Sequence, residues 1–119
     1  MLTGRGCAVQ FGCVLCTSTD METRDHLFLA CPYAGEFWLG LTAELNLPRI
    51  TETDPLTAWR RGRKRLQGAS RRRWDTAWAA GTWSLWKERN RRTFSQQRKP
   101  ADILINAATI EVHNWAVFI

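Results

Sequence analysis

Residues 70–94 read SRRRWDTAWAAGTWSLWKERNRRTF, and their periodicity is the main evidence for the fold class. Its apolar side chains recur at roughly the 3.6-residue period of an α-helix, which predicts one long amphipathic helix that Ser70 caps and that ends near Phe94. The apolar stripe consists of Trp74, Ala77, Trp78, Gly81, Leu85 and Trp86, together with Arg89. A shared face normally packs into the core, so we expect the tryptophans on this stripe to be buried. Trp83 lies off the stripe and is the candidate for an exposed ring that stacks on a base.

Prolines and a short linker define the other predicted helices. Residues 32–45 and 100–118 each begin with a proline, which suits the first helical turn. Residues 54–66 begin with an aspartate cap followed by a proline. The linker over residues 95–99 is short enough to force the last two helices into an antiparallel pair, in which Trp115 is expected to be buried.

Four metal-capable side chains follow one another near the N-terminus with the spacing C-x2-C-x9-H-x4-C. They are Cys13, Cys16, His26 and Cys31. A C-x2-C pair in a tight turn and a second pair from a following helix complete a tetrahedron, and three thiolates with one imidazole suit Zn²⁺. We expect one structural zinc ion, because four filled positions leave none for an activated water. Cys7 is left over, as a small partly buried thiol near the site or as a replacement for one ligand in an alternative set. His113 is expected to be a surface residue of the terminal helix.

The alternatives for these cysteines are two disulfides or a redox C-x-x-C motif. Disulfides are disfavoured because the sequence shows no signal peptide and intracellular thiols stay reduced. A redox motif needs a βαβ context, which the sequence lacks. His26 and Cys31 are five residues apart, about 140° out of phase on a single helix. They share a metal only if the chain turns between a short helix over residues 24–30 and Pro32.

Length, composition and periodicity together indicate one mainly α domain. The chain has 119 residues, of which 45% are hydrophobic, so it can bury one core. No strand signal of any length and no internal repeat is present. We expect a single domain over residues 1–119, with a small N-terminal zinc-binding lobe at about 5–45. A basic α-helical body at about 54–118 follows, with the long Trp- and Arg-rich helix and an antiparallel C-terminal helix.

Positive charge is concentrated in one block. The net charge is +6, but residues 60–99 hold fourteen basic and two acidic side chains, while the flanking residues are net negative. Clustered arginine favours a polyanion, with nucleic acid ahead of an anionic membrane surface, and the alternative is a solvated helix face. We expect weak, sequence-tolerant binding of RNA or single-stranded DNA. The candidate contacts are Arg60, Arg61, Arg63, Lys64, Arg65, Arg71, Arg72, Arg73, Lys87, Arg91 and Arg92.

Two groups within this block are predicted to differ in role. The three arginines at 71–73 open the long helix, where the helix dipole also favours anions, so this end is a candidate phosphate site. Arg89 lies on the apolar stripe instead. We expect it to be partly buried and structural, with an acidic partner such as Glu36 or Glu44.

The sequence gives no reason to expect a membrane protein or a secreted one. No apolar run approaches the roughly 18 residues of a membrane span, and the first residues lack the apolar region of a signal peptide. We therefore expect an intracellular protein, nuclear or cytoplasmic, with no membrane partner and no small-molecule substrate.

The residues quoted above resemble the reverse transcriptase zinc-binding domain of plant non-LTR (LINE-type) retroelement polyproteins. The likeness rests on Cys13-x2-Cys16, on the run from Glu22 to Tyr33 that contains His26 and Cys31-Pro32, and on Phe37-Trp38. It continues in Arg5-Gly6 and in Trp83-x-x-Trp86-Lys87-Glu88-Arg89-Asn90, which is similar to the family's Trp-x-x-Trp-x-x-Arg-Asn stretch. The likeness covers about residues 2–115. Cys7 departs from the family's usual ligand pattern.

The resemblance implies the zinc-binding tail of a polyprotein without its other domains. A reverse transcriptase needs paired aspartates that hold two metal ions, whereas this chain has no adjacent Asp pair and is far too short. We therefore expect no enzymatic activity. Three functions remain: a zinc-dependent nucleic-acid-binding module, a zinc-stabilised protein-interaction module, and a decayed retroelement fragment without selected activity. A steep fall of affinity with rising salt distinguishes the first from the other two.

Overall fold

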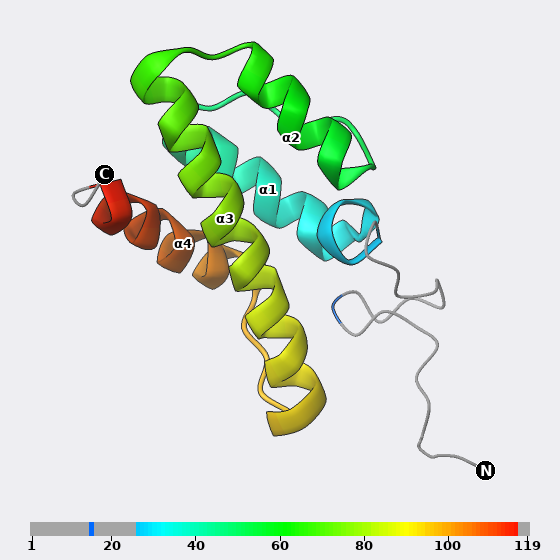
Figure 1. Cartoon of the computed structure of the whole chain (residues 1–119). Helices are drawn as coiled ribbons and strands as arrows, with labels where there is room; N and C mark the ends of the chain where they lie inside the picture. Colours follow the sequence, from blue (N-terminus) through cyan, green and yellow to red (C-terminus); the bar gives the residue numbers. More distant parts are fainter. Residues whose placement is uncertain (1–14, 16–25, 117–119) are drawn as a thin grey trace.

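Figure 1 shows the computed structural model of the chain, which describes Leu15 and residues 26–116. Within that part the chain is helical and contains no strand, which confirms the mainly α prediction. The elements in chain order are η1 (His26–Ala30), α1 (Pro32–Leu45), α2 (Pro55–Lys64), α3 (Gly68–Asn90), η2 (Arg91–Ser95) and α4 (Ala101–Ala116), where η marks a single π-helical turn. None of these helices is long and apolar enough to cross a membrane.

Turn chemistry sets the ends of α1 and α2. The Asp54 carboxylate accepts the backbone N–H of Thr57 at 2.9 Å, and Pro55 supplies the preformed first turn of α2. Asn46 ends α1 in the left-handed conformation, with φ 59°. Both helices therefore begin at the proline that the sequence indicates.

The turn between α2 and α3 differs from the prediction. α3 begins at Gly68 with Gln67 as its N-cap, so Ser70 lies inside the helix and is not the cap. Gly68 has φ +59°, a left-handed conformation that side chains disfavour, and a glycine adopts it without that penalty. The helix is therefore capped three residues earlier than the sequence pattern predicts, at Gln67 instead of Ser70.

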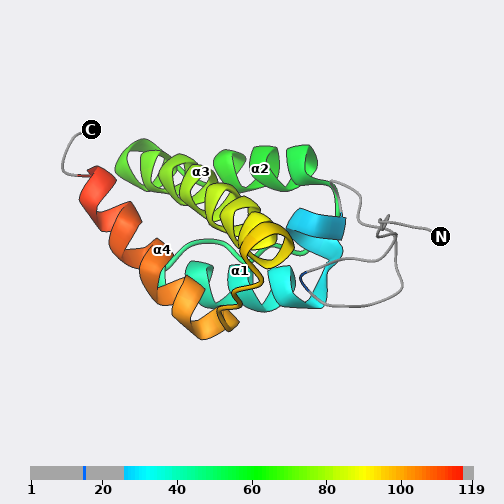
Figure 2. The same ribbon diagram turned by 90° about the horizontal axis from the view of Figure 1, so that it is seen from below.

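α3 is the central helix of the fold (Figure 2). α4 packs against both α1 and α3, and α2 packs on α3 from the other side. After residues 96–100, α4 runs back in the sense opposite to α3, at an inclination to it. The predicted antiparallel pairing of these two helices is therefore confirmed.

The main core lies between α1, α3 and α4. Its largest fully buried apolar side chains are Phe37, Leu41, Leu85 and Val112. Trp38 of α1 stacks on Trp78 of α3 with ring centroids 5.0 Å apart. Gly81 lies so close to the Trp38 ring that a Cβ atom there would overlap it. The close approach of α1 to α3 therefore depends on a residue without a side chain at this position.

Of the predicted stripe, Trp74 is buried as expected, whereas Trp78 is buried only in part. Trp74 is buried, and its indole N–H donates to the carbonyl oxygen of Trp59 at 3.0 Å. Gly62 of α2 lies directly against the Trp74 ring, so a Cβ atom there would overlap it. Trp78 is half-buried and packs against the core. The hydrogen bond to Trp59 and the contact with Gly62, both in α2, show that Trp74 holds α2 on α3.

The predicted burial of Trp86 and Trp115 is wrong, because both side chains are exposed. The buried line of α3 continues through Leu85 to Glu88, and Trp86 lies about 100° round the helix from Leu85. Trp83 is exposed, as predicted. The buried face of α3 therefore ends on a charged residue, Glu88, and leaves Trp86 outside it.

Candidate metal centre and nucleic-acid interface

The backbone of η1 joins two of the predicted zinc ligands. The Cys31 backbone N–H donates to the His26 carbonyl oxygen at 2.7 Å, five residues back. Cys31 then takes an extended conformation as the N-cap of α1, and Pro32 follows at the first helical position. A π-helical turn is wider than an α-helical one and bonds residue i to residue i+5. The turn that the spacing of these two ligands requires is therefore made by η1 together with Pro32.

His26 and Cys31 are both buried. An imidazole and a thiol on one backbone turn fit the ligand set that Zn²⁺ prefers. Cys13 and Cys16 lie outside the described residues. Within residues 15 and 26–116, no three metal-capable side chains form a group. The described part therefore contains half of the predicted centre, and its donors suit the metal.

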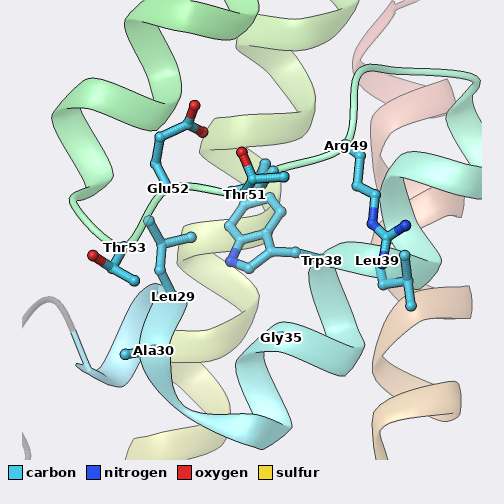
Figure 3. A pocket seen from close by; sticks show the side chains of 10 residues that line it. Leu29, Ala30, Gly35, Trp38, Leu39, Arg49, Thr51, Glu52 and Thr53 are labelled. Atoms are coloured by element: carbon cyan, nitrogen blue, oxygen red, sulfur yellow. The ribbon is translucent and has the colours of Figure 1, made fainter.

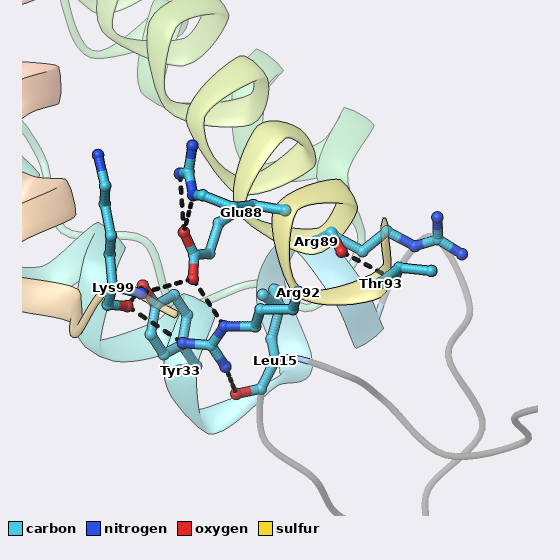
Figure 4. Close-up of polar contacts among 8 residues, drawn as sticks. Leu15, Tyr33, Glu88, Arg89, Arg92, Thr93 and Lys99 are labelled. Atoms are coloured by element: carbon cyan, nitrogen blue, oxygen red, sulfur yellow. Dashed lines mark hydrogen bonds and ion pairs between the residues drawn. The ribbon is translucent and has the colours of Figure 1, made fainter. Parts of the chain in front are cut away.

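A fully buried carboxylate lies at the end of α3 (Figure 4). The oxygens of Glu88 accept hydrogen bonds at 2.7 Å from Arg91 Nη2 and Arg92 Nε, and one at 2.9 Å from the Lys99 backbone N–H. Arg92 also donates to the carbonyl oxygens of Leu15 at 2.6 Å and Lys99 at 3.1 Å. Arg92 therefore connects α3 with the segment before α4 and with the residue between Cys13 and Cys16. The name Glu88 cluster is used below for Glu88, Arg91, Arg92, Lys99, Leu15 and Tyr33.

Tyr33 closes the Glu88 cluster from α1. The Arg92 guanidinium lies 4.5 Å from the ring centroid of Tyr33, whose hydroxyl donates to the Lys99 carbonyl oxygen at 2.7 Å. Burial, assisted by the negative charge of Glu88, raises the pKa of Tyr33 to about 12. Burial alone would raise the pKa of Glu88, but the hydrogen bonds from Lys99, Arg92 and Arg91 bring it below its ordinary value. At neutral pH the cluster thus holds an ionised carboxylate and a protonated phenol.

The contacts of three arginines near the end of α3 differ from those expected. The side chains of Arg92 and Arg91 are 7% and 23% exposed, and both pair with Glu88. The prediction that they extend the basic surface outward is therefore wrong. Arg89 is half-buried, as predicted. Its guanidinium lies 5.4 Å from the Trp86 ring centroid and donates to Asn90 at 3.1 Å, in place of the expected Glu36 or Glu44.

Several arginines at the α2–α3 end already have partners. Arg61 pairs with Glu52 at 3.1 Å, and Arg63 pairs with Asp75 at 3.0 Å. Arg71 donates to two carbonyl oxygens at the end of α2, at 3.0 and 3.1 Å. These contacts satisfy carbonyls that the helix end leaves without intrahelical partners, so Arg71 closes the α2–α3 turn.

The other basic residues at this end face solvent. Arg60, Lys64, Arg65 and Arg72 are exposed and make no ion pair within the part of the chain that the structure describes. Arg73 is half-buried, and its buried Nε has no acceptor among the described residues. Lys87 lies further along α3, 5.9 Å from the Trp83 ring centroid. The predicted phosphate contacts thus fall into two groups: residues that already bond to other parts of the protein, and exposed residues that make no ion pair within the described part of the chain.

A pocket of about 340 Å³ beside η1 is lined by none of the predicted site residues (Figure 3). Leu29 and Trp38 lie on its apolar side, and Arg49 and Glu52 come from the segment between α1 and α2. Glu52 is the one carboxylate among the described residues that line it, and it is already paired with Arg61. This lining therefore offers no pair of carboxylates for acid–base chemistry.

Residues 1–38 match the model of a protein family described as zinc-binding in reverse transcriptase. The matched segment contains all four predicted ligands and ends at Trp38 within α1, whereas α2, α3 and α4 lie beyond it. The match supports the resemblance over this segment, which is similar to the zinc-binding part of reverse transcriptases, an accessory part and not the catalytic one. The retroelement type and the likeness beyond residue 38 stay predictions. No curated protein and no solved structure matches the chain.

Proposed function

We propose that this chain is a structural-zinc module derived from a retroelement reverse transcriptase and that it binds RNA or single-stranded nucleic acid without sequence preference. It has no polymerase or nuclease activity of its own. The observation that supports the proposal is a group of four exposed cations where α2 meets α3, which make no ion pair among the described residues. We call Arg60, Lys64, Arg65 and Arg72 the basic end.

The zinc ion would be held by Cys13, Cys16, His26 and Cys31. When bound, it supplies a structural cross-link, since four protein ligands leave no position for a reactive water. His26 and Cys31 fix the start of α1, and Arg92 bonds to the carbonyl of Leu15, which lies between the other two ligands. An ordered zinc lobe therefore supports the helical body that carries the basic end.

A phosphate backbone binds most easily to cations that have no acidic partner to give up. Arg61 and Arg63 would have to leave Glu52 and Asp75, whereas Arg60 and Arg72 have no such contact to lose within the described part of the chain. Arginine also presents a planar fork that matches phosphate. Because these contacts recognise charge and not base edges, binding through them is tolerant of sequence and weakens as salt rises.

A double substitution, Arg60→Ala with Arg72→Ala, tests this proposal against a control that removes the same charge elsewhere. The control is Arg49→Ala with Arg98→Ala, two exposed residues outside the basic end. Affinity for a labelled single-stranded RNA is measured by fluorescence anisotropy at several salt concentrations. The first variant is expected to lose about 1.4 units of salt slope, near 0.7 for each phosphate contact. If both proteins bind equally at 1 M salt, that slope corresponds to about 25-fold weaker binding at 0.1 M.

The control is expected to keep the slope of the parent protein. Equal losses in both variants would mean that net charge alone matters and that the basic end is not a site. If the parent protein does not bind RNA even at low salt, the protein-interaction module and the decayed fragment become the better explanations.

A further inference from the structure

The second half of α3 exposes large aromatic side chains. Trp83 and Trp86 are 52% and 40% exposed, and Phe94 in η2 is 76% exposed. Large apolar side chains that gather on one exposed surface mark a binding site more often than isolated ones do. The aromatic rings at 83 and 86 are one helical turn apart, so one partner can contact both.

Each of these two indole rings has a cation over it. Lys87 Nζ lies 5.9 Å from the Trp83 ring centroid, and Arg89 Cζ lies 5.4 Å from that of Trp86. Both distances are within the range of a cation–π contact. Figure 4 shows Arg89 pointing away from the Glu88 cluster. A fitting partner therefore combines flat apolar faces with negative charge, and nucleotides combine both.

The same face of α3 leads to the basic end. Trp83 is eleven residues beyond Arg72, which places it about 16 Å further along the helix axis. Eleven residues make three full turns plus about 20°, so the two side chains lie on nearly the same line along the helix. Trp86 lies about 21 Å beyond Arg72 and about 40° from the same line. All three residues are exposed. A strand whose phosphates contact Arg72 can therefore follow one helix face and bring its bases to the rings.

We infer that Trp83 and Trp86, with Lys87 and Arg89, form a stacking platform for the unpaired bases of a single strand. This inference rests on the proposed function and deepens it, since the basic end binds any phosphate backbone whereas the platform binds only bases that are free of a duplex. Stacking on a ring does not require a particular base, because every base has a π-face. The platform thus gives the protein its preference for single strands over duplexes.

The test compares Trp83→Ala and Trp86→Ala with Trp115→Ala as the matched control. Trp115 is also an exposed tryptophan, but it lies on α4 and has no cation over its ring among the described residues. The probes are a labelled 15-nucleotide oligo(U) and a labelled duplex of the same length, each titrated at low and high salt. Loss of either ring is expected to weaken oligo(U) binding by roughly 5-fold to 140-fold and to leave duplex binding unchanged.

Two ring replacements separate stacking from mere apolar area and from loss of fold. Trp83→Phe keeps an aromatic face and is expected to keep most of the affinity, whereas Trp83→Leu keeps an apolar side chain and is expected to lose it. Circular dichroism checks that each variant is folded. If the two alanine variants bind oligo(U) as the parent does, or if single-strand and duplex binding fall together, the platform is refuted. If the parent binds neither probe at low salt, the proposed function itself fails.

Discussion

Replacing Glu88 by Gln is expected to destabilise the fold strongly. The amide keeps the size of the carboxylate and removes its charge, while the Arg92 side chain remains 7% exposed. Breaking a buried ion pair by removing one partner costs about 3–5 kcal/mol, because the other charge is left uncompensated. The substituted amide would retain one acceptor oxygen, and Arg91 is partly open to water, so we expect the lower end, about 3 kcal/mol.

Urea unfolding followed by far-ultraviolet circular dichroism measures this loss. For a domain of 119 residues, about 3 kcal/mol corresponds to a fall in Tm of roughly 12 °C. The control is Asp75→Asn, which breaks the ion pair with Arg63 at the other end of α3, where the two side chains are 38% and 33% exposed. Ion pairs open to water contribute at most about 1 kcal/mol. If Glu88→Gln costs no more than Asp75→Asn, the Glu88 cluster does not hold the fold together.

Two further predictions concern protons and metal. Because hydrogen bonds hold the pKa of Glu88 below its ordinary value of 4.5, its contribution to stability is complete above pH 4.5 and is lost as the pH falls through the folded-state pKa. Urea titrations at successive pH values should therefore show the parent approaching Glu88→Gln in acid, and a constant difference would contradict this. Purified protein is expected to hold one zinc ion per chain by metal analysis, and His26→Ala and Cys31→Ser are expected to lose it. His113→Ala changes an exposed residue of α4 and should keep the zinc, whereas full zinc content in His26→Ala would exclude the ligand assignment.

The helices could be predicted because their signals are local. α1 spans Pro32–Leu45, the same bounds that its opening proline and apolar spacing indicate. The cap of α2 is likewise an aspartate one residue before a proline, and the structure shows its carboxylate bound to the first turn. The long stripe predicted α3 and the burial of Trp74. A short linker then sufficed to predict that α4 returns along α3.

The Glu88 cluster could not be predicted, because the contacts that bury it come from distant residues. A glutamate three and four residues before two arginines is a weak local signal, and on a helix it is typical of a solvated ion pair. Glu88 accepts the Lys99 backbone N–H from beyond η2, and Tyr33 of α1 donates to the carbonyl oxygen of the same Lys99. The sequence predicted a partly buried arginine at position 89, which is confirmed, but it placed Arg92 on the surface, whereas that side chain is 7% exposed.

The candidate site was predictable in composition but not in its division of roles. Arginine content located the basic block, but only the tertiary structure shows that Glu52 and Asp75 neutralise two of its members and that Arg71 caps α2. The spacing of His26 and Cys31 required a turn between them. The form of that turn, a π-helical one, has no distinct sequence signal.

The Glu88 cluster joins residues that are far apart along the chain. The hydrogen bond from Arg92 to Leu15 spans 77 positions, and that from Tyr33 to Lys99 spans 66. Long loops lose more entropy when they close, so we expect these contacts to form after the helices and after the neighbouring pair α2–α3. Interactions that are absent from the folding transition state slow unfolding and leave the folding rate almost unchanged. The lifetime of the folded molecule, more than the speed at which it folds, therefore depends on these few charged side chains.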